Sequence, residues 1–371
     1  MKSSYDFAIL GGGIAGVSAA YFLSKTAKVA LIEREPSWGF HASGRSAAVL
    51  IEAYDNFILS DLTLDSKDFF INPDPEFSES PIVQPLGGVT VFRPDELEQA
   101  QSYLTHWQTR CPSLRLIDQS DAVSLIPILK AEAIAGAIYD PNLLSIDTHQ
   151  LLQCMLRGVR KHGGQLFCGI DSEPKITLHN IWEIDVGKVS VRAPVLINAA
   201  GAWANEVALM TGQQPLPLTP ARRTAAVIKV PGGAPDWPML KTFNQQLYVK
   251  PEQPGLLVSP QDETPSAAAD AYPEELDLAV AIERFEKLCE FSVSRIHRSW
   301  AGLRTLTPDR RPVLGFANTE EKFFWIAGQG GAGIQTAPAL GRIAANALIH
   351  GAAISSQLDP CRFARADDVS A

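Results

Sequence analysis

The stretch "AILGGGIAGVSAAYFLSKTAKVALIERE", residues 8–35, decides the fold of this chain. It contains an apolar run, the glycines Gly11, Gly13 and Gly16 in the spacing G-x-G-x-x-G, a segment of small and apolar residues, a second apolar run and Glu33. A strand that turns at Gly11 lets a pyrophosphate approach the backbone at Gly13, and Gly16 permits close packing of the following helix. Because Glu33 lies where such units bind a ribose hydroxyl, the stretch predicts a dinucleotide-binding βαβ unit.

The composition is that of an enzyme with two domains. A chain of 371 residues is too long for one ordinary core, and 46% hydrophobic residues argue against disorder. The net charge of −9 disfavours nucleic acid, and no apolar run is long enough for an integral membrane segment. We expect a cytoplasmic protein without a signal peptide, because the chain runs straight into its first strand. Five scattered cysteines and seven histidines without ligand spacing predict reduced thiols and no metal site.

The segment after this unit favours a flavin over a nicotinamide cofactor. In a nicotinamide dehydrogenase, strands and helices would continue directly, but residues 36–54, "PSWGFHASGRSAAVLIEAY", form a long polar loop with small residues. A bound ligand would order this loop, since Ser43, Gly44, Arg45 and Ser46 offer hydroxyls, backbone N–H groups and one cation to a phosphate or a ring edge. An ordinary surface loop is the alternative.

The rest of the chain alternates between the dinucleotide domain and two insertions. The first insertion, 78–146, contains short β-like runs around a helical segment, and a helix with Asp147 as its N-cap follows it. The segment "RAPVLINAAGAWA", 192–204, is expected to be a buried strand followed by small residues that can pass beneath a cofactor. A second, β-rich insertion closes with a helix over 273–291. We place the FAD-binding domain at 1–77, 147–210 and 320–371, and the substrate-binding domain at 78–146 and 211–319.

The C-terminal stretch "FFWIAGQGGAGIQTAPALGRIAANALI" is again a strand, a glycine turn and a helix, which runs to about residue 349. A separate NADPH site would need another strand with an acid or an arginine about twenty residues after the glycines, and too little chain remains for it. We therefore expect the N–H groups at 330–333 to serve the other end of the same cofactor, where a reduced flavin carries negative charge.

Several motifs together resemble the D-amino-acid oxidase superfamily of FAD enzymes. They are the unit at 11–33, "GFHASGRSAA" at 39–48, "LINAAGAWA" at 196–204, "WAGLRTLTPDRRPVLG" at 300–315 and "GQGGAGIQTAPALG" at 328–341, and they span nearly the whole chain. Within the superfamily, the sequences of these motifs are most similar to those of bacterial D-arginine dehydrogenase-like flavoproteins. The resemblance implies an α/β FAD-binding Rossmann-like domain of the glutathione-reductase and p-hydroxybenzoate-hydroxylase type, plus a β-rich α+β substrate domain made of two insertions.

The resemblance implies FAD as the cofactor. The lack of cysteine at 43–54 and 300–336 predicts that it is bound noncovalently. Adenosine is expected at Glu33, Arg34 and Ser172, the pyrophosphate at Gly11, Gly13, Ile14, Ala15 and Gly16, and the rest of the cofactor at Ala42, Ser43, Gly44, Arg45, Ser46, Ala47, Ala48, Val49, Gly201, Gly330, Gly331, Ala332, Gly333, Ile334, Gln335 and Thr336.

Oxidation of an amino acid at Cα by hydride transfer to flavin N5 requires a fixed carboxylate and a neutral amine. A bidentate arginine is the natural carboxylate clamp, and the family pattern maps onto Arg304 in "WAGLR" and Arg223 in "RRTA". Tyr54 and Tyr248 match tyrosines that close or line the substrate pocket in the family. The alternatives are salt bridges for the arginines and ordinary core packing for the tyrosines.

One position departs from the pattern of the cation-preferring relatives. Those relatives place a carboxylate on the strand that matches "QPLGGVTVF", and Gly88 stands at the equivalent position here. Because a buried guanidinium without a partner is unfavourable, we expect uncharged substrate side chains. Lys250 is expected in solvent rather than beside the reacting groups.

These inferences predict an FAD-dependent enzyme that oxidises an uncharged D-amino acid to an imine, which water hydrolyses to a 2-oxo acid and ammonia. Oxidation of glycine, sarcosine or another N-substituted amino acid remains open, as does a flavoprotein subunit of an electron-transfer complex. Oxygen, a quinone or another carrier is the expected electron acceptor.

Overall fold

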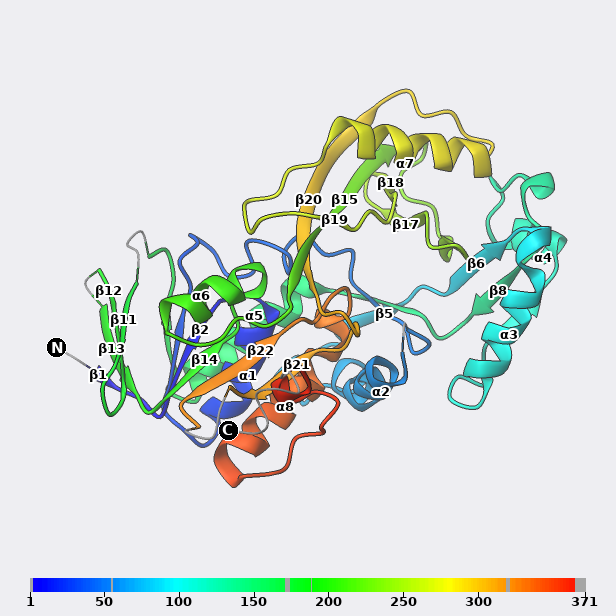
Figure 1. Cartoon of the computed structure of the whole chain (residues 1–371). Coiled ribbons are helices and arrows are strands. Elements are labelled where there is room, and N and C mark those ends of the chain that lie inside the picture. The colour runs from blue at the N-terminus through cyan, green and yellow to red at the C-terminus, as the bar shows by residue number, and fades with distance from the viewer. Residues whose placement is uncertain (1–2, 55, 171–173, 188, 318–320, 364–371) are drawn as a thin grey trace.

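The computed structural model describes residues 3–54, 56–170, 174–187, 189–317 and 321–363. Figure 1 shows two layered parts, each built around its own large sheet. The sheet of the first part has six strands in the order β10 (Gln165–Phe167), β3 (Val29–Ile32), β2 (Phe7–Leu10), β14 (Val195–Asn198), β22 (Phe323–Ala327) and β21 (Val313–Phe316). Neighbouring strands run parallel, except β21 and β22.

Helices cover one face of this sheet, and a second sheet covers the other face. The helices are α1 (Ile14–Ser24), α5 (Thr148–Lys161) and α8 (Gly333–His350), with α2 (Phe57–Ile71) packed against α8. The other face carries α6 (Ala204–Met210) and the sheet of β1 (Ser3–Ser4), β13 (Val189–Ala193), β12 (Trp182–Val186) and β11 (Lys175–Leu178). Since both faces are covered, every residue of β2 and β3 is buried.

The second part is built on a nine-stranded sheet. Its order is β19 (Thr264–Pro265), β15 (Thr219–Lys229), β18 (Gly255–Ser259), β17 (Tyr248–Glu252), β16 (Met239–Thr242), β6 (Gly88–Phe92), β8 (Gly136–Asp140) and β7 (Arg115–Ile117), with β20 (Ile296–Leu306) also paired to β15. Helices α4 (Gln119–Leu125) and α7 (Glu275–Leu288) cover its outer face. Its inner face presents Met239, Tyr248 and Leu257 to Ile51 of the first part.

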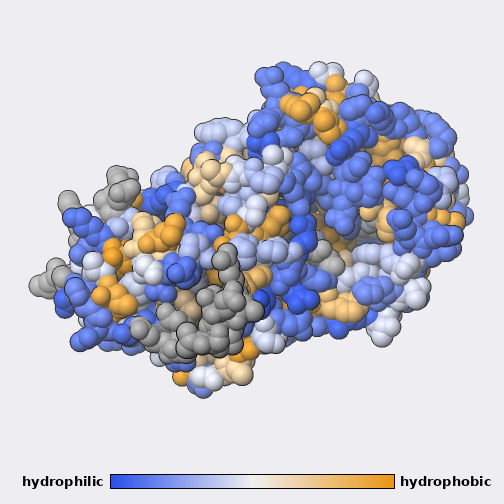
Figure 2. Space-filling view, viewed as in Figure 1, coloured by the Kyte–Doolittle hydropathy of each residue, from blue (hydrophilic) through white to orange (hydrophobic). Residues whose placement is uncertain are grey.

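Smaller elements complete the described chain. They are the sheet of β4 (Val49–Leu50), β9 (Leu144–Ile146) and β5 (Val83–Pro85), helix α3 (Leu97–Gln108), and the 3-10 turns at Pro94–Glu96, Ala131–Ala133, Gly201–Trp203 and Pro360–Phe363. Figure 2 shows that hydrophilic residues cover much of one face of the molecule, with apolar residues scattered among them. In the described part of the chain, every helix falls short of the length or apolarity that a bilayer crossing requires.

The predicted fold class, a Rossmann-like α/β domain with a β-rich second domain, is confirmed. The expected N-cap is present, since the carboxylate of Asp147 accepts a hydrogen bond from Gln150 N over 2.8 Å. The buried strand followed by small residues that was expected within 192–204 is present as β14 and residues 199–202, which line the cavity. The first residues of the segment instead end β13, which belongs to a different sheet, and Pro194 separates the two strands. Helix α2 was not predicted. The domain boundaries stay a prediction, and β21, from the segment assigned to the substrate domain, pairs with β22.

The turn after β2 generates the first testable prediction. Gly11 has a φ of +111°, and a Cβ there would lie 2.3 Å from the carbonyl oxygen of Ala199. We expect Gly11→Ala to lower the free energy of unfolding by about 3 kcal/mol or more, since strained backbone and overpacking add together. Urea denaturation followed by circular dichroism measures this loss.

Gly163→Ala is the matched control. Gly163 also has a positive φ, +87°, but a Cβ there would meet no atom within 4 Å. Its loss should be about 1 kcal/mol, from the backbone conformation alone. Equal losses in the two variants would show that the contact with Ala199 costs nothing.

Candidate active site

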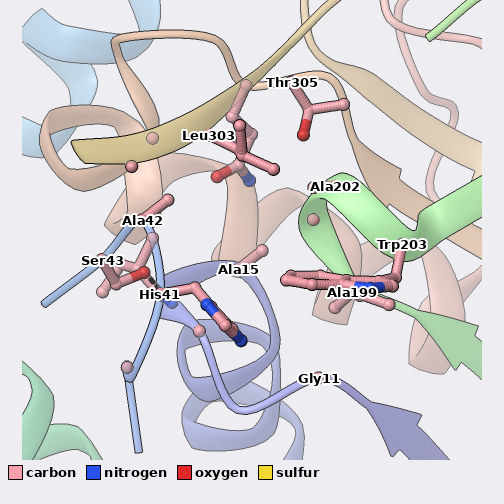
Figure 3. Close-up of a pocket in the computed structure, with 18 of the residues that line it drawn as sticks. Gly11, Ala15, His41, Ala42, Ser43, Ala199, Ala202, Trp203, Leu303 and Thr305 are labelled. Carbon is pink, nitrogen blue, oxygen red and sulfur yellow. Dashed lines mark hydrogen bonds between the residues drawn. The ribbon is translucent and has the colours of Figure 1, made fainter. Parts of the chain in front are cut away.

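An elongated cavity runs between the glycine turn of the first part and the inner face of the second part. It encloses about 1880 Å³, open solvent at its mouth included. Figure 3 shows Gly11 and Ala15 facing Leu303 of β20 across the cavity, with Ser43 on one flank and Trp203 on the other. The cavity therefore lies where the segments that were assigned to the cofactor and to the substrate meet.

Backbone groups of the glycine turn orient Glu33 at one end of the cavity. Glu33 Oε2 accepts a hydrogen bond from Gly12 N over 2.6 Å, and Oε1 accepts one from Glu35 N over 2.9 Å. At the start of α1, Ile14 N donates to Ser43 Oγ over 2.9 Å, so the loop after β3 is fixed to the helix N-terminus. These contacts hold an acid and a helix N-terminus at adjacent points of one wall.

Stacked rings and charges form the wall beyond Glu33. The guanidinium of Arg34 lies 4.6 Å from the ring centroid of Trp203, and the His41 ring lies 4.5 Å from the same centroid. His41 Nε2 is 2.9 Å from Glu35 Oε1. Burial raises the pKa of Glu35, but hydrogen bonds from His41 and Arg34 outweigh it and hold the pKa below its ordinary value. This arrangement supplies a flat aromatic surface with a cation over it.

The guanidinium of Arg45 is already paired within the protein. Arg45 Nη1 donates to the carbonyl oxygens of Ala271 and Ala301, each over 2.9 Å, and Nη2 lies 2.5 Å from Asp270 Oδ1. Trp300 Nε1 donates in turn to the carbonyl of Arg45 over 2.9 Å. The sequence predicted a cation for a phosphate or ring edge at Arg45, whereas the structure shows this cation joining the loop to the second part.

The second glycine turn lies close to the polar end of the cavity, which is the end with Arg223, Arg304, Tyr248 and Tyr54. Gly330 has a φ of +52°, and its N–H donates to the carbonyl of Thr305 over 2.9 Å. A Cβ on Gly331 would lie 2.3 Å from Tyr54 Oη and 2.7 Å from Arg304 Nη1. A side chain at Gly331, two residues before α8, would therefore displace the polar ends of Tyr54 and Arg304.

Two arginines and two tyrosines gather at this end. Arg223, Arg304 and Tyr248 line the cavity, while Tyr54 lies against Gly331. Burial and the positive charge of Arg304 lower the pKa of Arg223 to about 10. Arg223 Nη2 forms an ion pair with Glu263 Oε1 over 2.9 Å, but Arg304 makes no hydrogen bond or ion pair with the residues that the structure describes. Among the described residues, Arg304 thus lines the cavity without a counter-ion.

Apolar side chains surround Tyr248. Ile51, Ala225, Met239, Leu143 and Leu257 pack with it in one cluster. Gly88 is not among the residues that line the cavity, and a Cβ there would meet Leu143 Cδ1 at 2.7 Å. Its assignment to the side-chain pocket stays a prediction. The expectation for Lys250 is wrong: its side chain is 8% exposed, and burial lowers its pKa.

Most residues predicted to bind the cofactor line this one cavity. They are Gly11, Gly13, Ile14, Ala15, Glu33, Arg34, Ala42, Ser43, Arg45, Ser46, Ala47, Gly201, Gly330, Gly331, Gly333 and Ile334. Others have positions behind the wall: Gly16, Gly44, Ala48, Val49, Ala332, Gln335 and Thr336. Gly16 serves close packing, since a Cβ there would lie 1.9 Å from the carbonyl oxygen of Gly11. Ser172 lies outside the described residues.

The sequence analysis missed several lining residues. Among them are Trp203, Thr305 and Gln329, which lie within the motifs quoted above but were not singled out there. The buried Nε2 of Gln329 has no hydrogen-bond partner among the described residues, and neither has that of Gln335. Buried donors of this kind fit a cofactor with ring carbonyls, so the residues present fit a flavin. Within the described ranges, no three His, Cys, Asp or Glu side chains form a metal-binding group.

Comparison with known proteins agrees with this geometry. Dimethylglycine dehydrogenase, mitochondrial, of Mus musculus is 26% identical over 396 residues, which cover 98% of this chain and 45% of that protein. This chain thus spans about half the length of that relative. The structure is also similar to L-proline dehydrogenase from P. horikoshii (TM-score 0.85, 21% identity, 98% of both chains) and to glycine oxidase from Geobacillus kaustophilus (TM-score 0.83, 22% identity, 95% and 96%).

The likeness to the two solved structures supports the fold. The family follows from a separate match that covers most of the chain. This match confirms the superfamily and the FAD cofactor that the motifs predicted. The finer resemblance to D-arginine dehydrogenase-like flavoproteins stays a prediction. Residues 6–347 match the family model described as FAD dependent oxidoreductase (DAO), and the chain belongs to this family.

Proposed function

We propose that this protein oxidises the C–N bond of an amino acid with one carboxylate and an uncharged side chain, with D-amino acids as the first substrate class. The observation that carries the proposal is the guanidinium of Arg304 at the polar end of the cavity, which has no partner in the described part of the chain. An arginine cannot lose its charge at physiological pH, so a partly buried guanidinium without a counter-ion favours an anionic ligand. A substrate carboxylate supplies that anion in a bidentate geometry.

The neighbouring groups support the rest of the reaction. FAD, when bound, supplies the acceptor for the hydride that leaves the substrate Cα. Tyr248 lies in the same wall as Arg304 and offers a hydroxyl beside the bound carboxylate. The apolar cluster around Tyr248 excludes water from the substrate side chain. Hydrolysis of the imine product then gives a 2-oxo acid and ammonia.

A second candidate is oxidation of glycine or an N-methylated glycine. Relatives whose names refer to dimethylglycine and glycine favour it. The same carboxylate clamp and flavin would serve both substrate classes, so bleaching of the flavin under anaerobic conditions by a panel of D-amino acids, glycine and sarcosine separates them. A protein that no amino acid bleaches would instead fit a flavoprotein subunit of an electron-transfer complex. Reoxidation with oxygen or a quinone identifies the acceptor in the same experiment.

Noncovalent attachment of FAD is the second testable prediction. No cysteine is among the described residues that line the cavity. Acid precipitation of the purified yellow protein should therefore release all of the flavin into the supernatant, where its absorption spectrum identifies it. Colour that stays in the pellet would contradict noncovalent binding.

The third prediction concerns the carboxylate clamp. Arg304→Ala should leave FAD bound but lower kcat/KM for amino acids by about a hundredfold, because about 3 kcal/mol of charge-assisted hydrogen bonding is lost in a largely dry site. Arg304→Lys should recover part of this loss, since it keeps the charge without the planar fork. Steady-state kinetics of the three proteins measure the effect.

An amine without a carboxylate provides the control for this variant. Its oxidation should change little in Arg304→Ala, because the lost interaction involves only the carboxylate. Near-normal turnover of amino acids by the variant would remove Arg304 from the substrate site.

The fourth prediction concerns the substrate side chain. Gly88 pairs with Asp140 on β8. Burial raises the pKa of Asp140, and the positive charge of Lys241 opposes this rise, so the acid nearest to Gly88 already has a cation near it. A substrate guanidinium would lack an unpaired acid there, and kcat/KM should be higher for uncharged D-amino acids than for D-arginine.

Gly88→Glu tests the register of this pocket. The new side chain should raise the relative kcat/KM for D-arginine, provided that Leu143 turns aside. A wild-type enzyme that strongly prefers D-arginine would contradict the prediction and would show that another acid faces the substrate.

A further inference from the structure

Arg223, the second arginine at the polar end of the cavity, forms an ion pair with a carboxylate of the protein. Arg223 is only 10% exposed, and its Nη2 lies 2.9 Å from Glu263 Oε1. Arg223 comes from β15, and Glu263 directly precedes β19, which pairs with β15 beside it. The ion pair is therefore formed between neighbouring segments of the same sheet, and Arg223, but not Glu263, is among the residues that line the cavity.

A second arginine holds Glu263 from the other side. Arg310 Nη2 lies 2.8 Å from Glu263 Oε2 and 3.0 Å from Oε1. Asn56 Nδ2 donates to the carbonyl of Arg310 over 3.4 Å, which connects this arginine to the segment that follows Tyr54. Glu263 therefore has two cationic partners that fix its position, and it is not a side chain that swings freely toward the substrate.

Glu263 offsets part of the positive charge at this end of the cavity. Arg223 and Arg304 carry two positive charges, and Glu263, which Arg310 also binds, offsets part of the charge of Arg223. Arg223 Nε is buried without a hydrogen-bond partner among the described residues, so its guanidinium is only partly satisfied. Burial of two neighbouring guanidinium groups without this carboxylate would be costly, and the proximity of Arg304 opposes the charge on Arg223.

We propose that Glu263 determines substrate specificity: it forms an ion pair with Arg223 as an internal counter-ion, so that the site accepts amino acids with one carboxylate and rejects those with two. The inference rests on the proposed function, in which Arg304 binds the substrate carboxylate. A second carboxylate near Arg223 would face the negative charge of Glu263 and would lose its hydration without gaining a cation. Removal of the Glu263 charge makes Arg223 available to that second group.

The test measures carboxylate binding without turnover. Acetate and malonate are added to the FAD-loaded protein, and their dissociation constants are read from changes in the flavin absorption spectrum. Wild type should bind acetate at least as tightly as malonate, and Glu263→Gln should shift the ratio at least about tenfold toward malonate, since a tenfold change corresponds to 1.4 kcal/mol. Glu263→Gln combined with Arg223→Met should lose this gain.

Glu274→Gln is the matched control. Glu274 forms an ion pair with Arg222, the neighbour of Arg223 on β15, and Arg222, unlike Arg223, does not line the cavity. This variant should keep the wild-type ratio. Sarcosine and iminodiacetate, which differ by a second carboxylate, extend the comparison to kcat/KM, and the same reversal is expected in Glu263→Gln.

The outcomes separate this inference from the proposed function. Tighter binding of malonate than of acetate by wild type, or an unchanged ratio in Glu263→Gln with FAD bound, overturns the role of Glu263. Tighter binding of malonate than of acetate by wild type would overturn the role of Glu263 even if the variant does not fold. Failure of every amino acid to bleach the flavin overturns the proposed function, whereas the ratio of the two dissociation constants still tests the charge balance at Arg223.

Discussion

The close approach of backbone segments at the turn after β2 is the constraint on which the rest of the structure depends. A Cβ on Gly16 would lie 1.9 Å from the carbonyl oxygen of Gly11, and one on Gly11 would lie 2.3 Å from that of Ala199. The first contact sets how closely α1 packs on the sheet, and the second brings β14 beside β2. Because no side chain fills this turn, one wall of the cavity consists of backbone, small residues and the N-terminus of α1. An extended anionic cofactor can lie along such a wall.

The second part supplies the apolar face and the two arginines at the polar end of the cavity. Its nine-stranded sheet has apolar side chains on both faces, but helices cover only the outer one. The inner face is left for the cavity, and β15 and β20, which pair along most of their length, bring Arg223 and Arg304 to its end. Contacts of the loop after β3 join the two parts: the guanidinium of Arg45 binds Asp270, and Trp300 Nε1 donates to the carbonyl of Arg45 over 2.9 Å. The geometry of the polar end thus depends on contacts between segments far apart in the sequence.

This dependence explains which features could be predicted from the sequence. The βαβ unit is local, and its glycine spacing and continuous apolar runs predicted β3 at its observed bounds and the helix that follows Gly13. The arginines of the cavity were found through a family pattern, not through their surroundings. Their ion pairs could not be predicted, because Glu263 lies 40 residues from Arg223 and becomes its neighbour only when β19 pairs with β15. Lys250 was misjudged for the same reason, since burial of β17 depends on the whole sheet. Gln329 and Trp203 lie within quoted motifs, but the motifs do not show which of their side chains face a ligand, and the cavity does.

Most of the charged side chains described around the substrate end lie near a group of opposite charge, and Arg304 is an exception. Glu52 and Lys67 form a pair at 2.5 Å, Arg222 binds Asp277 at 2.9 Å, Arg223 binds Glu263, and Lys241 lies within electrostatic reach of Asp140. Lys250 is buried within electrostatic reach of Glu252, but burial still lowers its pKa, and a lysine can release its proton. Arg304 has neither a counter-ion among the described residues nor the ability to become neutral. An unpaired guanidinium costs stability unless a ligand or water compensates it, and functional sites are where such costs are retained. Among the described residues at this end of the cavity, Arg304 is therefore the one that best fits the anion-binding role that we propose.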